Sequence, residues 1–368
     1  MIPVNRPLIS PLAEELIVRC LREGWISSEG PWVQRFEEDM AAMVGVKHAV
    51  AVCNGTAALD IAVRALGIGV GDEVILPSLT IISCASSLIQ AGAIPVPVDV
   101  DPVTWNLDPA AVEAAITSRT KAIMPVHLYG LPVDMDPILA LAGKHKLLVL
   151  EDAAEAHGLR YNGRPCGSMG HAATFSFYAN KHVTSGEGGM VLTSDDGVAS
   201  RCRSLRNLCF GPVRFVHEEL GWNYRMASLQ AALGIASLAD LPSTIARKRR
   251  LGDQYLTALR GTPGVTFAPP ATSYATNDYW VFGMVLDSGR GLTAENLAQK
   301  LSKRGVATRP FFFPIHRQPA LLRMGLQMQR PCTISDTLAL YGLYLPSGIG
   351  TTDEEIRVVI DAVKAALL

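Results

Sequence analysis

The sequence predicts an α/β protein with a mostly parallel, seven-stranded sheet flanked by helices, followed by a smaller C-terminal α+β domain. Between residues 48 and 193, short runs rich in Val, Ile and Leu alternate with helical patterns. These runs are apolar on both faces, as expected for parallel strands that helices cover on two sides. With 368 residues the chain is also longer than one hydrophobic core usually serves, so we expect two domains.

The predicted sheet region begins after two helical patterns at residues 12–23 and 33–44, which either reach a partner subunit or cover the site. Further helical patterns at 56–65, 110–116 and 135–144 alternate with the strands, so most connections are expected to be β-α-β units. The predicted strands are 48–52, 73–76, 94–98, 122–126, 147–151, 173–177 and 189–193.

A helical stretch from 228 to 259 separates the sheet region from the C-terminal part, and Pro242 interrupts it. We therefore predict a large domain at 1–241 and a small domain at 242–368. The basic run at 247–250 is either a solvated helix face or lies near a phosphorylated ligand. The predicted elements of the small domain are 279–286, 294–304, 306–309 and 354–367.

The composition argues against several classes of partner. Lys and Arg total 33 against 34 Asp and Glu, so there is no broad positive field for nucleic acid or anionic membranes. The cysteines are odd in number (7) and include no Cys-x-x-Cys pair, which disfavours a disulfide framework and a zinc site. Neither a signal peptide nor an apolar run of about 20 residues is visible. We expect a cytoplasmic protein that binds no metal, nucleic acid or membrane.

The first candidate site is the junction at 53–58, where a predicted strand runs into a predicted helix. Small residues such as Gly55 and Thr56 let backbone N–H groups approach an anion, and the helix dipole favours a phosphate there. The alternative is purely structural, with Asn54 capping the helix and Gly55 making the turn.

The second is the carboxyl end of the apolar run at 147–150, which leads into Asp152 and, three residues later, Glu155. In open α/β sheets this end faces the ligand crevice. A carboxylate there can keep a proton on a heteroaromatic nitrogen or orient a histidine, or Asp152 only caps a helix. No other Asp, Glu or His cluster has the spacing of a metal site.

The third is Lys181, which follows one predicted strand and precedes a Gly-rich loop into the next. Lysines are usually surface charges, but a partly desolvated lysine at a strand end can lose its proton and form a Schiff base. The combination favours the second interpretation. Pyridoxal 5′-phosphate needs an anion site for its phosphate, an acid partner for its pyridine nitrogen and an amine for its aldehyde.

Seven ordered segments match one family pattern along essentially the whole chain: 24–30, 54–59, 71–78, 125–130, 151–158, 176–189 and 221–226. On these segments the chain resembles fold-type-I pyridoxal-phosphate enzymes, and specifically the DegT family of sugar aminotransferases that act on nucleotide-linked keto sugars. The resemblance implies that Lys181 is the Schiff-base lysine and that Asp152 pairs with the pyridinium nitrogen. It also implies that the backbone of Gly55 and Thr56, with the Ser176 hydroxyl, binds the phosphate.

The resemblance further implies a homodimer with shared active sites, because Asn223 corresponds to a residue that reaches the phosphate of the neighbouring subunit. It implies L-glutamate as the amino donor. A relative that dehydrates a keto sugar carries His in place of the lysine; here His182 is one position away, which favours transamination.

Two positions depart from the family pattern. Glu155 stands where Gln is frequent, facing the cofactor's ring oxygen, and a carboxylate would repel that oxygen unless they share a proton. Ile81 stands where many relatives place an aromatic ring against the cofactor. Ile81 can still pack on that face through dispersion, but stacking is lost.

Within the family, the similarity is strongest to enzymes whose substrate is GDP-4-keto-6-deoxymannose, aminated at C4 for O-antigen or other glycan biosynthesis. Arg309 is available to the diphosphate and His316 to the hexose or nucleotide, with Trp25, Ser27 and Ser28 closing the other side of the pocket. Alternatively, Arg309 forms a structural ion pair and His316 is a satisfied histidine.

Two other functions stay open on the sequence. One is a related aminotransferase acting on a UDP- or dTDP-linked hexose, or on an eight- or nine-carbon acid sugar. The other is a cofactor-binding regulatory protein without turnover, which a missing lysine or aspartate would favour; both residues are present.

Overall fold

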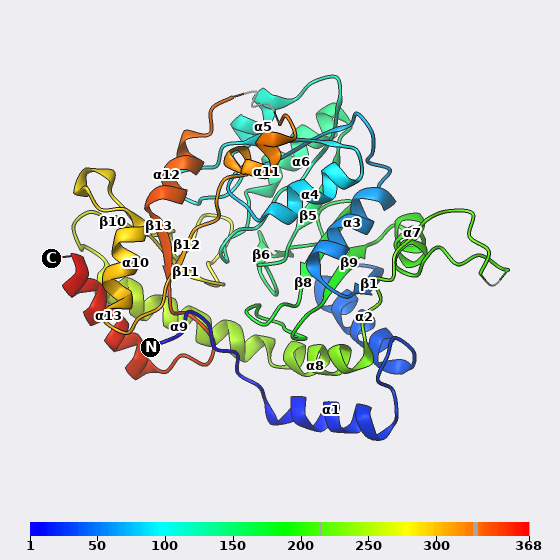
Figure 1. Ribbon diagram of the computed structural model, residues 1–368, viewed down its shortest axis with the longest axis horizontal. Helices are drawn as coiled ribbons and strands as arrows, with labels where there is room; N and C mark the ends of the chain where they lie inside the picture. The colour runs from blue at the N-terminus through cyan, green and yellow to red at the C-terminus, as the bar shows by residue number, and fades with distance from the viewer. Residues whose placement is uncertain (214, 327–329, 368) are drawn as a thin grey trace.

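The computed structural model describes residues 1–213, 215–326 and 330–367, and its centre is a seven-stranded sheet (Figure 1). The strand order is β1-β9-β8-β5-β4-β2-β3. Only β9 runs against its neighbours; the other pairs are parallel. The predicted, mostly parallel sheet is confirmed. Its strands are β1 (His48–Val52), β2 (Glu73–Pro77), β3 (Ile94–Val98), β4 (Thr120–Ile123), β5 (Leu148–Asp152), β8 (Ala172–Ser176) and β9 (Gly189–Thr193).

Six of the seven strands lie within one residue of their predicted bounds, but the strand predicted at 122–126 is wrong at both ends. It begins at Thr120 and ends at Ile123. Pro125 has no N–H group to give to a ladder, and beyond it only an isolated bridge joins Val126 to Asp152.

Helices cover both faces of the sheet, and the burial of β1 illustrates this. Val50 and Val52 pack into one core with α3 (Gly55–Ala65), whereas Ala49 and Ala51 pack into another with α2 (Pro31–Val44) and α8 (Ser228–Ala239). The helices of this region are α1 (Pro11–Arg22), α2 (Pro31–Val44), α3 (Gly55–Ala65), α4 (Ile82–Gln90), α5 (Pro109–Ala115), α6 (Met135–His145) and α7 (Asp196–Arg206). A short hairpin, β6 (Arg160–Tyr161) and β7 (Arg164–Pro165), follows β5.

The predicted break at Pro242 is confirmed. Helix α8 (Ser228–Ala239) and helix α9 (Leu241–Leu259) meet at a bend of 62°, with the proline in the first turn of α9. Over the described ranges, no single helix has the length and apolar character to cross a membrane; only this bent pair passes that test by length and composition.

The C-terminal part carries an antiparallel sheet of order β10-β11-β13-β12. Ile2 pairs with Val306, so the N-terminus lies against this part of the chain (Figure 1). The domain boundary at 241/242 therefore stays a prediction. The elements are β10 (Val265–Thr266), β11 (Phe282–Leu286), η1 (Ser288–Arg290), α10 (Ala294–Ser302), β12 (Arg309–Pro310), η2 (Ile315–Arg317), α11 (Pro319–Arg323), α12 (Thr333–Tyr341), β13 (Gly342–Leu345) and α13 (Asp353–Leu367).

Candidate active site

A cavity of about 320 Å³ opens at the carboxyl ends of β5 and β8, beside the N-terminus of α3. This is where an open α/β sheet places its ligand. It is lined by most of the residues that the sequence singled out: Gly55, Thr56, Ile81, Asp152, Glu155, Ser176, Lys181 and Arg309.

One wall of the cavity is a close approach between the start of α3 and the end of β8. A side chain on Gly55 would place its Cβ 2.8 Å from the Cβ of Ser176, so only glycine allows this contact. Asn54 caps α3 by accepting a hydrogen bond from the Ala57 amide at 2.8 Å. The amides of Gly55 and Thr56 find no acceptor among the residues that the structure describes. The capping interpretation and the anion-site interpretation therefore both hold, on different N–H groups.

Asp152 ends β5 with its carboxylate held from two sides. Oδ1 accepts a hydrogen bond from the Ala154 amide at 3.0 Å, and Oδ2 accepts one from the Cys84 thiol at 3.1 Å. No helix begins directly after Asp152, so the helix-cap interpretation does not apply. Cys84 was not identified as a site residue from the sequence. It lies 68 residues from Asp152 in the chain, and no motif around it indicates a contact with that carboxylate. Burial raises the pKa of this thiol well above its usual range, so it donates as a neutral group.

Lys181 and Glu155 form a buried pair, with Nζ 3.5 Å from Oε1 and side chains only 9% and 7% exposed. Lys181 is therefore not a surface charge. Burial lowers the pKa of Lys181, although the carboxylates of Glu155 and Asp152 oppose that shift. Burial raises the pKa of Glu155 to about 7, against the stabilisation that Lys181 and the Tyr129 amide give to the carboxylate. Burial therefore favours the neutral form of each group, whereas their mutual attraction favours the charged forms.

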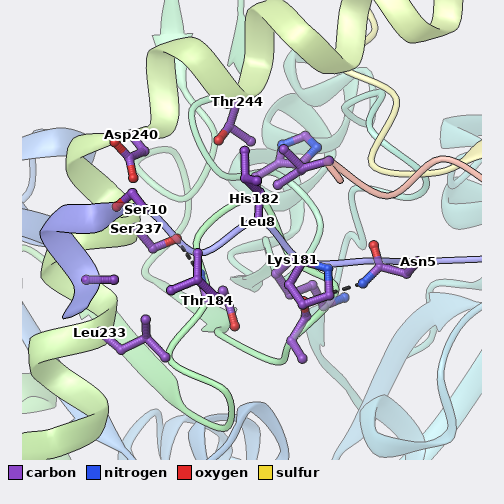
Figure 2. Close-up of a pocket in the computed structure, with 15 residues that line it drawn as sticks. Asn5, Leu8, Ser10, Lys181, His182, Thr184, Leu233, Ser237, Asp240 and Thr244 are labelled. Carbon is purple, nitrogen blue, oxygen red and sulfur yellow. Dashed lines mark hydrogen bonds between the residues drawn. The ribbon is translucent and has the colours of Figure 1, made fainter. Parts of the chain in front are cut away.

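The loop that carries Lys181 packs against α8 and the N-terminal segment, with a small cavity of about 30 Å³ between them (Figure 2). The backbone amide of Thr184 donates to the Ser237 hydroxyl of α8 at 2.9 Å, and the side-chain amide of Asn5 donates to the Ala179 carbonyl at 3.5 Å. His182 lies beside this cavity, and burial lowers its pKa well below the usual range. The loop is thus a packed part of the protein.

The structure does not bring Trp25, Ser27, Ser28 or Asn223 to the cavity of the same chain. The segment at 24–30 is tied instead to α8, because the Ser228 amide donates to the Ser27 carbonyl at 2.6 Å. Asn223 is exposed after a loop that projects away from the sheet (Figure 1). Their roles stay predictions.

His316 also lies outside the cavity, with both ring nitrogens bonded. Nδ1 is 2.6 Å from the Ser78 hydroxyl and Nε2 is 3.1 Å from a carboxylate oxygen of Asp336. This matches the satisfied histidine of the structural alternative. Arg309 is exposed at the cavity mouth and forms no ion pair with any carboxylate in the described ranges, so its structural alternative is not matched.

Aromatic residues that sequence reasoning did not assign complete the wall on the side of the C-terminal sheet: Tyr178, Trp280, Phe312 and Tyr344. Within the described part of the chain, no three His, Cys, Asp or Glu side chains are grouped so as to hold a metal ion.

Comparison with known proteins agrees with this geometry. The model of the DegT/DnrJ/EryC1/StrS aminotransferase family matches residues 9–364. A Caulobacter vibrioides protein named GDP-perosamine synthase is 42% identical over 368 residues, covering 100% of this chain and 98% of that protein. GDP-perosamine synthase of Escherichia coli O157:H7 is 37% identical, with 98% and 97% covered. The solved structure of DesI in the presence of its TDP-sugar product has a TM-score of 0.91 at 36% identity, covering 100% of this chain and 93% of that chain.

The chain therefore belongs to the DegT/DnrJ/EryC1/StrS aminotransferase family. It is an aminotransferase with the fold-type-I architecture of this family, and membership implies that it uses pyridoxal 5′-phosphate. The predicted class and fold are confirmed.

Proposed function

We propose that this enzyme transfers an amino group from L-glutamate to C4 of GDP-4-keto-6-deoxymannose, producing GDP-perosamine for O-antigen or other glycan biosynthesis. The observation that carries the proposal is the 42% identity to the Caulobacter GDP-perosamine synthase across the whole chain. The converging lysine, carboxylates and helix N-terminus supply the groups that such a reaction needs.

The cavity fits pyridoxal phosphate in its own geometry. Gly55 and Thr56 begin α3 beside Ser176 on the cavity wall, and a helix N-terminus next to a hydroxyl suits a phosphate. Gly189 is needed as well, since a Cβ there would lie 2.3 Å from the Asn54 carbonyl oxygen and displace this turn. Ile81, 40% exposed and lining the cavity, offers an apolar face to the ring.

Bound in this place, pyridoxal phosphate supplies a conjugated ring that accepts the electrons of a substrate Cα–H bond. Asp152 would hold the proton on the pyridine nitrogen, and its carboxylate is oriented by Cys84 and the Ala154 amide. Lys181 would hold the cofactor through its aldehyde carbon and would move a proton as general base and acid. Burial lowers the pKa of this amine, which favours the neutral form that a base requires.

Glu155 takes the position beside the cofactor's ring oxygen. The pKa of about 7 supports a shared proton there, which removes the repulsion expected of a fixed carboxylate. Arg309, exposed at the mouth and without a carboxylate partner in the described ranges, is placed to bind the substrate diphosphate.

The active unit in this proposal is a cytoplasmic homodimer whose active sites are shared. The loop before Asn223 exposes apolar side chains that a second copy would cover: Phe210, Val213, Val216 and Leu220. Asn223, exposed next to them, would reach the phosphate in the partner's cavity. The seven cysteines are free thiols, in line with a reducing compartment.

A TDP-linked keto sugar is the second candidate substrate, because DesI was solved with a TDP-sugar product and superposes along the whole chain. The two candidates share the chemistry at Lys181 and differ in the nucleotide.

Difference spectroscopy of the reconstituted protein separates these possibilities. We expect a visible absorption band near the violet edge that borohydride removes, that is absent in Lys181→Ala and that persists in the surface control Lys144→Ala. L-glutamate should bleach it, and GDP-4-keto-6-deoxymannose should restore it. If only a UDP- or dTDP-linked sugar restores the band, the GDP assignment is wrong. If glutamate leaves the band unchanged, the donor is wrong.

A further inference from the structure

The basic run of α9, residues 247–250, binds the segments that flank strands β11 and β13 of the C-terminal sheet. Lys248 is buried, and its Nζ donates to the carbonyls of Trp280 at 2.7 Å and Ser347 at 2.5 Å. Arg249 pairs with Asp278 at 2.7 Å. Arg247 donates to the carbonyl oxygens of Ile349 and Thr351. The predicted solvated face therefore holds for Arg249 and Arg250, which are exposed, but not for the buried Lys248.

The segment at 278–280 is held from its other side by the loop that follows β4. The Asp278 amide donates to the Gly130 carbonyl at 2.8 Å. Gly130 has a φ of 95°, and a Cβ on it would lie 2.4 Å from the Trp280 nitrogen. Only glycine combines this backbone conformation with so close a contact. The position of Trp280 is therefore fixed by α9 on one side and by the loop after β4 on the other.

The indole of Trp280 contacts the site lysine directly. Lys181 Nζ lies 3.8 Å from the ring centroid. The indole N–H donates to the Asn180 carbonyl at 2.9 Å, and the ring stacks at 15° on Tyr129. Tyr129 in turn gives its amide to Glu155 at 2.8 Å. The contact between Trp280 and Tyr129 therefore links both members of the Lys181–Glu155 pair.

We propose that Trp280, anchored by Lys248 and Gly130, is a positioning residue that holds the amine of Lys181 and stabilises its protonated form through the face of the indole. The inference rests on the proposed function in one respect, the role of Lys181. A ring face attracts an ammonium group, most strongly where water is excluded. The lysine can thus retain the proton that it has removed from substrate until it is delivered.

The other titratable groups around Lys181 are Glu155, Asp152, His157 and His182. Burial lowers the pKa of both histidines, so they are neutral at physiological pH and do not compensate for loss of the ring.

Competitive acetylation of the cofactor-free protein across a pH series, read by mass spectrometry of the Lys181 peptide, tests this contact without enzymatic turnover. In Trp280→Leu we expect the labelling midpoint of Lys181 to move to lower pH, with Trp280→Phe intermediate. Below the midpoint, labelling of Lys181 should rise by roughly two- to thirty-fold in the Leu variant, the range that a cation–π contact supports. Trp32→Phe, which alters an indole contact with Arg19 outside the cavity, should leave Lys181 unchanged.

If the pH midpoint of Lys181 labelling is unchanged in Trp280→Leu, the proposal is overturned. A change confined to the limiting rate of labelling at high pH also overturns it, because that rate reports how easily the reagent reaches the lysine. If labelling of Lys248 rises as much as that of Lys181, the C-terminal sheet has opened. That result also overturns the proposal that Trp280 acts locally on Lys181. Lys248→Met should shift the labelling midpoint of Lys181 in the same direction, because it removes the hydrogen bond that anchors the Trp280 backbone. The control is Arg250→Met, which changes an exposed residue of the same basic run. Failure of the proposed function is a separate result, since it appears as absence of the borohydride-sensitive band in the wild-type protein.

Discussion

At the scale of single residues, the surroundings of Glu155 explain how a carboxylate is accommodated in the cavity. Its side chain is buried, its Oε2 is bound by the Tyr129 amide, and the approach of Lys181 only partly offsets the cost of burial. The pKa of about 7 makes the group neutral in part of the population at physiological pH. Below that pH the group is neutral, as a Gln side chain is; above it the group is a carboxylate.

Glu155→Gln should therefore flatten the pH dependence of cofactor binding. If the protonated form of Glu155 binds the ring oxygen, the apparent Kd of the wild type for pyridoxal phosphate rises by up to about ten-fold between pH 6 and pH 8. The variant should change by much less. Absorption titrations at both pH values measure this, and equal slopes for the two proteins would rule out the shared proton.

His157 makes the acid stability of the protein depend on one buried ring. Neither ring nitrogen has a partner among the described residues, and burial lowers the pKa to about 3 from an ordinary value of 6.5. Between these pH values the unfolded chain binds the proton and the folded chain does not, so this contribution to stability is lost as pH falls from about 6.5 to about 3.

His157→Phe keeps an aromatic ring against Phe175 and removes the proton site. The urea midpoint of the variant should fall less than that of the wild type between pH 7 and pH 5. Parallel losses in the two proteins would show that other groups govern acid unfolding.

Several site residues were predictable because parallel strands bring their carboxyl ends to one edge. Lys181, Asp152 and Gly55 each follow an apolar run, and they meet in the cavity. Cys84 and Trp280 were not predictable. They reach Asp152 and the lysine loop across 68 and 100 residues of chain, through packing that no local pattern encodes.

At the scale of elements, the turn between β1 and α3 depends on the strand beside it. Gly189 begins β9 against the Asn54 carbonyl oxygen and the Gly55 amide nitrogen, and a Cβ on Gly189 would lie 2.3 and 2.8 Å from these atoms. Any side chain there pushes the helix N-terminus away from the cavity.

Gly189→Ala should therefore cost at least about 2 kcal/mol of unfolding free energy, as overpacking of a core site does, and should weaken cofactor binding. Gly143→Ala is the matched control: it lies in α6 with open space around it and should stabilise by about 0.5–1 kcal/mol. Denaturant unfolding with and without cofactor measures both, and equal effects of the two substitutions would contradict the close-contact argument.

The number of strands was predictable because strands that helices cover on both faces are apolar throughout. The ends of a strand depend instead on its hydrogen bonds to the adjacent strands. The ladder of β4 ends before Pro125 because the proline has no N–H to donate, although the apolar run continues to Val126. Apolar periodicity does not report that limit.

At the scale of the whole molecule, the proposed dimer places one subunit's Asn223 in the other's site. This can be tested by mixing two inactive variants, Lys181→Ala and Asn223→Ala. Random reassortment yields half heterodimers, each with one intact site, so activity should recover to about a quarter of the wild type.

The control is a mixture of Lys181→Ala with Asp152→Ala. These two residues line the same cavity of one chain, so every site of the heterodimer lacks one of them and no activity should return. Absence of recovery in the Lys181→Ala and Asn223→Ala mixture, after subunit exchange has been verified, would contradict the shared site.

Whole-molecule organisation was predictable only in part. Length and apolar patterning indicated a large α/β region and a smaller C-terminal region, and two sheets are present. The pairing of Ile2 with Val306 was not predictable, because a single bridge between distant segments leaves no periodic pattern.

The assignment of Lys181 as the Schiff-base lysine can be tested by reducing the pyridoxal-phosphate-loaded protein with borohydride and locating the pyridoxyl group by peptide mass spectrometry. We predict one adduct, on Lys181. Lys248 is the other buried lysine, and burial lowers its pKa to about 7, so it is a chemically credible competitor. An adduct on Lys248, or on no lysine, would contradict the assignment of the active site.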